Sequence, residues 1–231
     1  YLLQQSDATT LIRVGGIREP DEYLKILDKV CPVIKDSEPG KLNCEKLPFL
    51  KNVVYLGKEK MAGMFNWDEL LAMGRSVSDE ALLARLNSLD PDDVINMQYT
   101  SGTTGFPKGV MLTHTNLIGN AMSMAECMKL TPDDAMCIPV PFFHCFGCVI
   151  GTLCCMVSGT TMAPVVAFTP AAVLKTVEAS KCNALLGVPT MFIAEFEEMD
   201  KNSYDTSSLR TGVMAGSTCP VEVMKRVIKD R

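Results

Sequence analysis

The sequence predicts an α/β protein of layered sheets with flanking helices. From Thr10 onward, short runs rich in β-branched residues alternate with longer stretches of helical periodicity, which is the pattern of strand–helix crossover units. The chain has 231 residues and 47% hydrophobic content, enough to bury one large core or two small ones. A globular chain is therefore expected.

The first part of the chain begins with a crossover unit. Gly15–Gly16 ends the first strand, and Pro20 opens a helix whose acidic residues lie near its positive end. Residues 35–51 are rich in Pro, Gly, Asn and charge and predict a surface loop. The predicted elements here are strand 11–14, helix 20–30, strand 53–56 and helices 67–73 and 78–86.

A boundary is predicted after Asp90. The turn sequence Asp90-Pro91-Asp92-Asp93 separates the acidic helical part from the strand that follows. We therefore predict two portions, residues 1–90 and residues 91–231, both α/β.

The second portion continues the alternation of strands and helices. Its last helix begins at Val221 and carries an apolar stripe that includes Met224, Val227 and Ile228. The predicted strands are 94–99, 136–140, 160–164, 184–187 and 212–215, and the predicted helices are 116–128, 147–156, 169–180, 190–199 and 221–231.

Charge and cysteine content exclude several classes of protein. The net charge is −5, and no basic block could neutralise a row of phosphates, so no nucleic-acid partner is expected. The ten cysteines include the adjacent pair Cys154–Cys155 in an apolar run, which favours reduced, buried thiols. The cytoplasm or another reducing intracellular compartment is the expected location.

Membrane and secretory segments are not expected either. Tyr1–Gln5 has neither the basic nor the apolar region of a secretory signal. The longest apolar run, Cys145–Val157, is shorter than the ~20 residues that span a bilayer. It predicts a buried helix.

A glycine-rich loop follows the strand that ends at Tyr99. Glycines allow backbone N–H groups to approach phosphates closely, hydroxyl groups donate to phosphate oxygens, and a lysine adds positive charge. The loop matches neither the Walker nor the Rossmann pattern, and a glycine-rich surface turn is the alternative. The predicted phosphate-binding residues are Thr100, Ser101, Gly102, Thr103, Thr104, Gly105, Phe106, Pro107 and Lys108.

This loop carries a family resemblance. Residues 99–109 resemble the phosphate-binding signature of the adenylate-forming superfamily, and residues 141–147 and 212–220 keep the order and spacing of two further signatures. Residues 187–192 and 209–217 are most similar to medium-chain fatty-acyl-CoA synthetases. The resemblance implies part of the N-terminal domain of an adenylate-forming enzyme.

The resemblance also implies a two-step reaction. A small-molecule carboxylic acid attacks the α-phosphate of ATP to give acyl-AMP and pyrophosphate, and the thiol of CoA, a co-substrate, then displaces AMP. Mg²⁺ would neutralise phosphate charge. Catalysis of this kind depends on positioning and charge stabilisation, so Lys108 is the predicted leading cation. A homo-oligomer is compatible with the sequence.

Other site residues follow from the resemblance, each with a structural alternative. His144 would orient the carboxylate or gate the acyl pocket, or else be a hydrogen-bonded core histidine. The predicted neighbours of the acyl chain are Phe146, Val188, Thr190 and Met191, for which core packing is equally compatible. The predicted adenine neighbours are Ser217, Thr218 and Cys219, which could instead form a helix N-terminus.

Two further features, a histidine and a pair of cysteines, are interpreted as structural and not as parts of a site. His114 lies where the family often has histidine, but helix capping at Thr115 or Asn116 explains that stretch. The pair Cys145 and Cys148 has CxxC spacing but no second ligand pair at zinc spacing. We expect buried thiols beside the acyl tunnel.

The chain lacks an initiator Met, and its last predicted helix has no stop signal, so we expect a segment of a longer polypeptide. In the family, a magnesium-binding glutamate, an acidic residue for the ribose and a small C-terminal domain with a catalytic lysine would follow. The C-terminal domain is expected to be absent here and the segment alone to be inactive. A non-catalytic nucleotide-binding module, or an acceptor other than CoA, is the alternative.

Overall fold

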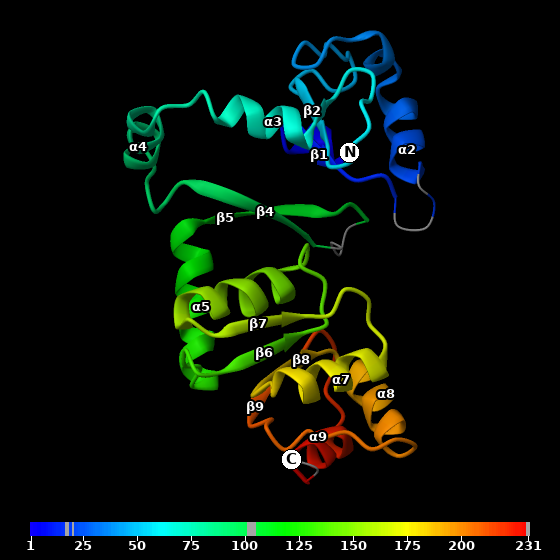
Figure 1. Cartoon of the computed structure of the whole chain (residues 1–231), viewed down its shortest axis with the longest axis vertical. Coiled ribbons are helices and arrows are strands. Elements are labelled where there is room, and N and C mark those ends of the chain that lie inside the picture. The colour runs from blue at the N-terminus through cyan, green and yellow to red at the C-terminus, as the bar shows by residue number, and fades with distance from the viewer. Residues whose placement is uncertain (17–18, 20, 101–104, 230–231) are drawn as a thin grey trace. The chain divides into compact units, whose positions relative to one another are not determined.

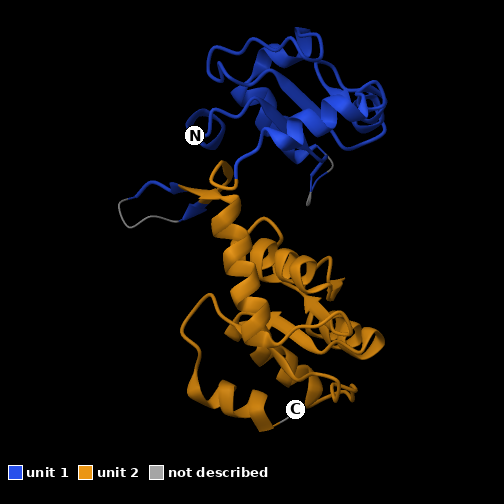
Figure 2. Cartoon of the chain, turned by 90° about the vertical axis from the view of Figure 1, so that its left-hand side faces the viewer, with its two compact units in different colours: residues 1–90, 99–109 blue, residues 91–98, 110–231 orange. Residues whose placement is uncertain are grey.

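The computed structural model describes residues 1–16, 19, 21–100 and 105–229 (Figure 1). The chain divides into two compact units (Figure 2). Unit 1 comprises residues 1–90 and 99–109, and unit 2 comprises residues 91–98 and 110–231.

Unit 1 contains a three-stranded parallel sheet in the order β1-β2-β3. Its elements are α1 (Leu2–Gln5), β1 (Thr10–Arg13), α2 (Glu22–Val30), the 3₁₀ helix η1 (Pro32–Asp36), β2 (Asn52–Tyr55), β3 (Phe65–Asn66), α3 (Trp67–Gly74) and α4 (Asp79–Asn87). Leu27 of α2, Ile34 of η1 and Val53 of β2 are buried in one core. The predicted strands and helices of this part are confirmed, and the structure adds α1, η1 and β3.

The glycine-rich loop connects two strands that pair with each other, β4 (Val94–Thr100) and β5 (Lys108–Thr113). The sequence predicts β4 but not β5. The helix α5 (His114–Met128) begins directly after β5 with a capping box, in which Thr113 Oγ1 accepts from Asn116 N and Asn116 Oδ1 accepts from Thr113 N. A helix cap does lie at the His114 stretch, but the N-cap is Thr113 and not Thr115 or Asn116; Asn116 takes part as the N3 residue of the box.

Unit 2 is built on a four-stranded parallel sheet in the order β7-β6-β8-β9. Its elements after α5 are β6 (Ala135–Ile138), the π-helix η2 (Phe146–Leu153), α6 (Cys154–Ser158), β7 (Thr161–Pro164), α7 (Pro170–Ser180), β8 (Ala184–Gly187), α8 (Pro189–Met199), β9 (Thr211–Met214) and α9 (Val221–Lys229). A parallel sheet with helices on its faces confirms the predicted α/β class.

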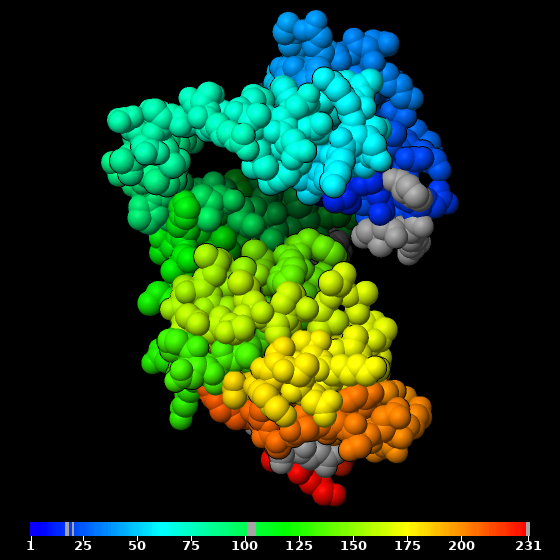
Figure 3. Space-filling view, viewed as in Figure 1, coloured from blue at the N-terminus to red at the C-terminus, as the bar shows by residue number. Residues whose placement is uncertain are grey.

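Successive residues of the central strands face two different cores, as the two-residue period of a strand requires. Met136 and Ile138 of β6 belong to a core with α5 and η2. Cys137 and Leu185 belong to the other, with α7 and α8. The last two helices, α8 and α9, are in contact with each other. Figure 3 shows the orange surface that the residues around position 200 form below the yellow residues of the sheet and its helices.

The apolar run predicted as one helix is a π-helix, η2, followed by the short α-helix α6. Gly147 and Gly151 of η2 come close to other backbone and side-chain atoms. A Cβ at Gly147 would lie 2.3 Å from the Pro141 carbonyl oxygen, and one at Gly151 would lie 3.0 Å from Ile138 Cγ2. No helix in the described part of the chain is long and apolar enough to cross a bilayer.

An ion pair between a buried carboxylate and an exposed guanidinium joins three elements of unit 2. Asp134, just before β6, is 6% exposed and receives hydrogen bonds from Arg210, just before β9. Arg210 also donates to the carbonyls of Met128 and Lys129 at the end of α5, at 3.1 and 2.8 Å. Burial would raise the pKa of Asp134, but the hydrogen bonds from Arg210 and Thr131 outweigh it and lower that pKa.

Candidate functional site

The candidate site lies at the carboxyl ends of β6, β8 and β9. Strand β7, which follows β6 in the chain, pairs with one edge of β6, and β8 pairs with the other edge. The strand order therefore reverses between β6 and β8. In open parallel sheets, ligands bind outside the carboxyl ends of strands at such a reversal. The predicted segments 141–147, 187–192 and 212–220 follow β6, overlap the end of β8 and contain the end of β9, respectively.

His144 lies on the exposed segment after β6, between that strand and η2. Its Nδ1 accepts a hydrogen bond from Phe146 N at 3.1 Å. Because Nδ1 is the acceptor, the neutral ring carries its proton on Nε2, which can donate to an anion. Because His144 is exposed, the core-histidine alternative does not describe it.

Three of the four residues predicted beside the acyl chain lie in one apolar cluster. Phe146 is 6% exposed, and Val188 and Met191 are partly buried against the same core. Thr190 is exposed at the start of α8. The structure thus brings together Phe146, Val188 and Met191, while Thr190 faces outward.

The residues predicted beside adenine follow β9. Ser217 and Thr218 are exposed, and the Cys219 thiol donates to the Met214 carbonyl at 3.3 Å. Gly216 before them has a φ of +91°, and a Cβ there would lie 3.0 Å from Val188 Cγ1. This contact places the predicted adenine segment against the predicted acyl segment.

The glycine-rich loop is described at its two ends, and Ser101, Gly102, Thr103 and Thr104 lie outside the described residues. Thr100 is exposed at the end of β4, and Lys108 is exposed at the start of β5. Gly105 has a φ of +93°, a region that favours glycine. Phe106 is 70% exposed, and its ring centroid is 6.0 Å from that of Tyr1, whose hydroxyl donates to Pro107 O at 2.8 Å.

The expectation that Cys145 and Cys148 are buried thiols is wrong. Cys145 is exposed in the turn before η2, and Cys148, the third residue of η2, is partly exposed. Cys154 and Cys155, by contrast, are buried. Burial raises the pKa of the Cys154 thiol to about 11 and that of the Cys155 thiol to about 12.

No metal centre is assigned. Within residues 1–16, 19, 21–100 and 105–229, no group of three or more His, Cys, Asp or Glu side chains is placed to hold a metal ion.

One buried acid was not predicted as a site residue. Glu195 lies on the buried side of α8 between Phe192 and Phe196 and is 3% exposed. An acid inside the apolar stripe 192, 196 and 199 is the sequence signal that could have identified it.

Comparisons with known proteins match this chain to an AMP-binding enzyme family and to relatives named as acyl-CoA synthetase or ligase. The profile of the family described as AMP-binding enzyme matches residues 1–230. YngI of Bacillus subtilis (strain 168), assigned as an acyl-CoA synthetase, is 56% identical over 229 residues, which are 99% of this chain and 42% of that protein. The mitochondrial medium-chain acyl-CoA ligase ACSF2 of Macaca fascicularis is 36% identical over 215 residues, covering 90% and 34%.

A solved structure shares the fold. The crystal structure of the anthranilate CoA ligase AuaEII with anthranoyl-AMP has a TM-score of 0.75 and 20% identity, covering 99% of this chain and 40% of that one. The chain therefore spans less than half the length of each protein compared.

Proposed function

This chain belongs to the AMP-binding enzyme family, and from that premise we propose that it is part of an ATP-dependent ligase that converts a medium-chain fatty acid to acyl-CoA. Relatives named as acyl-CoA synthetase and acyl-CoA ligase support the reaction. The observation that carries the proposal is the convergence of the segments after β6, β8 and β9 at one edge of the sheet.

In the proposed first step, a carboxylate oxygen forms a bond to the α-phosphorus of ATP while the bond to the bridging oxygen breaks and pyrophosphate leaves. His144 Nε2 would orient the carboxylate, and Phe146, Val188 and Met191 would border the acyl chain. Ser217 and Thr218 would lie beside adenine. The loop between β4 and β5 would bind the β- and γ-phosphates, with Lys108 offsetting the charge that develops on pyrophosphate.

In the proposed second step, the CoA sulfur forms a bond to the acyl carbon while the bond from that carbon to the phosphate oxygen breaks, so that AMP leaves and the thiol proton passes to solvent. Three apolar side chains in one cluster suit an alkyl chain, because an apolar slot excludes water from it. The name of the ACSF2 relative favours medium chain length.

Ten free thiols favour a reducing intracellular compartment. Mg²⁺ remains an expectation from the family, and no step above depends on its ligands.

The proposal is tested with the longest natural polypeptide that contains these residues. Given ATP, CoA and acids of about six to twelve carbons, it is expected to form acyl-AMP and then the CoA thioester, both detectable by mass spectrometry. The isolated 231 residues are expected to show no acid-dependent ATP–pyrophosphate exchange, since they span 42% of YngI. Failure with every acid would favour a non-catalytic nucleotide-binding module, and acyl-AMP without thioester would indicate another acceptor.

The Lys108→Met variant of the same polypeptide is expected to lower the rate of ATP–pyrophosphate exchange by about 10- to 100-fold, because one cation facing the leaving group is lost. Lys58→Met, at another exposed lysine of unit 1, is the matched control and should leave the rate unchanged. Equal rates for the two variants would remove Lys108 from the site.

A further inference from the structure

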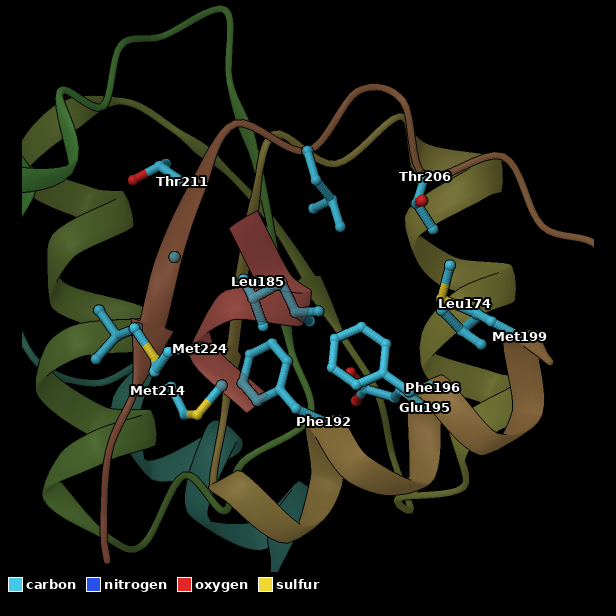
Figure 4. Close-up of a pocket in the computed structure, with 14 residues that line it drawn as sticks. Leu174, Leu185, Phe192, Glu195, Phe196, Met199, Thr206, Thr211, Met214 and Met224 are labelled. Carbon is cyan, nitrogen blue, oxygen red and sulfur yellow. The ribbon is translucent and has the colours of Figure 1, made fainter. Parts of the chain in front are cut away.

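An apolar pocket lies on the face of the unit 2 sheet opposite the predicted acyl cluster. It has a volume of about 110 Å³ and is lined from α7, α8, α9, β8 and β9 (Figure 4). Leu185 and Phe192 lie in its wall, together with Met214 and Met224. Met224 is 39% exposed, so this part of the pocket wall is in contact with solvent. None of the predicted site residues lines it.

Glu195 introduces a carboxyl group into this apolar wall (Figure 4). Its side chain is 3% exposed, and Oε1 is buried without a hydrogen-bond partner among the described residues. The residues that line the pocket in the described part of the chain include no Lys, Arg or His. Arg226 of α9 lies over the Phe196 ring, 4.4 Å from its centroid, and pairs with Asp200. Burial raises the pKa of Glu195 to about 7.

A buried acceptor without a donor costs free energy, and a ligand that brings the donor removes that cost. The apolar walls require an apolar body on that ligand. The carboxylate disfavours an anion and favours a cation with N–H groups. A cavity of about 150 Å³ accommodates benzene, so the smaller volume here suits a molecule of about four or five heavy atoms.

We propose that this pocket binds a small aliphatic primary amine, with the ammonium group donating to the Glu195 carboxylate and the alkyl body against the phenylalanine and methionine side chains. This inference is independent of the proposed ligase function. It gives the chain a second small-molecule site, on the opposite face of the sheet from the segment that would hold the fatty acid.

The test uses n-butylamine and the full chain labelled with ¹³C at the methionine methyl groups. At pH 8, the methyl signals of Met199, Met214 and Met224, which line the pocket, should shift with a Kd of about 1–10 mM, in the range for so small a ligand. The signal of Met64, buried in the core of unit 1, should not move. Each signal is assigned from its Met→Leu variant.

Two variants and two analogues decide the result. Glu195→Gln should weaken butylamine binding at least tenfold, whereas Glu197→Gln, at an exposed acid of the same helix, should leave it unchanged. Butyrate should not bind, and n-butanol should bind more weakly than the amine. Equal binding of amine and alcohol, retained binding in Glu195→Gln, or no shift of the three methyl signals would each overturn the proposal.

Discussion

Replacing Arg210 by methionine is expected to lower the free energy of unfolding by about 2–4 kcal/mol, because it leaves a buried carboxylate without its cation. Asp134 would keep its hydrogen bonds from Thr131 but lose both from Arg210. The carbonyls of Met128 and Lys129 at the end of α5 would lose a donor as well. Urea denaturation of the two proteins at pH 7 measures the difference.

The control for this prediction is Lys181→Met. Lys181 pairs with Asp205 at 2.6 Å in the same unit, but both side chains are largely exposed. Exposed pairs contribute little to stability because solvent screens them. A loss for Arg210→Met no larger than that for Lys181→Met would show that the Asp134 pair does not stabilise the fold.

The second prediction with a large expected effect concerns how the stability of the fold depends on pH. Glu195→Gln is expected to make the chain more stable than the wild type at pH 8 by up to about 3 kcal/mol, since a pKa raised from 4.5 to about 7 corresponds to about 1.4 kcal/mol for each unit. Below pH 4.5, the two proteins should be about equally stable. Between these values, the unfolded wild type ionises while the folded state keeps its proton, so its stability falls as pH rises.

The titration of neighbouring groups does not account for this pH dependence of stability. Cys137 of β6 faces Glu195, and its hydrogen bond with Cys182 and its burial raise its thiol pKa well above the ordinary value. At the rim, Arg226 pairs with Asp200, whose pKa is lowered by that hydrogen bond. Denaturation of the wild type, Glu195→Gln and Glu197→Gln from pH 4 to 8 provides the comparison. An unchanged pH slope in Glu195→Gln would contradict the assignment.

Most of unit 2 was predictable because its strands are short, apolar and separated by helices with clear start signals, as at Ala184–Gly187 and Pro189. Strand β5 was not, because Lys108 and Gly109 open it and its exposure pattern, with Val110 and Met111 both exposed, lacks the alternation of a half-buried strand. The π-helix η2 has the same apolar composition as an α-helix, so composition could not identify it.

The site was predictable only in part. Motif resemblance placed His144, Val188 and Ser217 on segments that parallel pairing brings to one edge of the sheet. No pattern in the sequence indicated that Thr190 faces outward while Met191 packs inward, since that depends on how α8 leaves β8. Glu195 was missed because an acid in a helix is ordinarily taken as solvent-exposed.

The close approach of Gly216 to Val188 has an evolutionary consequence under the proposed function. A larger side chain at Val188, acquired to shorten the accepted acid, would press on the backbone that precedes Ser217 and Thr218. Acid preference and nucleotide affinity would then change together. Lineages that change their substrates would be expected to do so first at Met191 or Phe146. Substitutions at these two positions do not press on Gly216 unless the backbone itself moves.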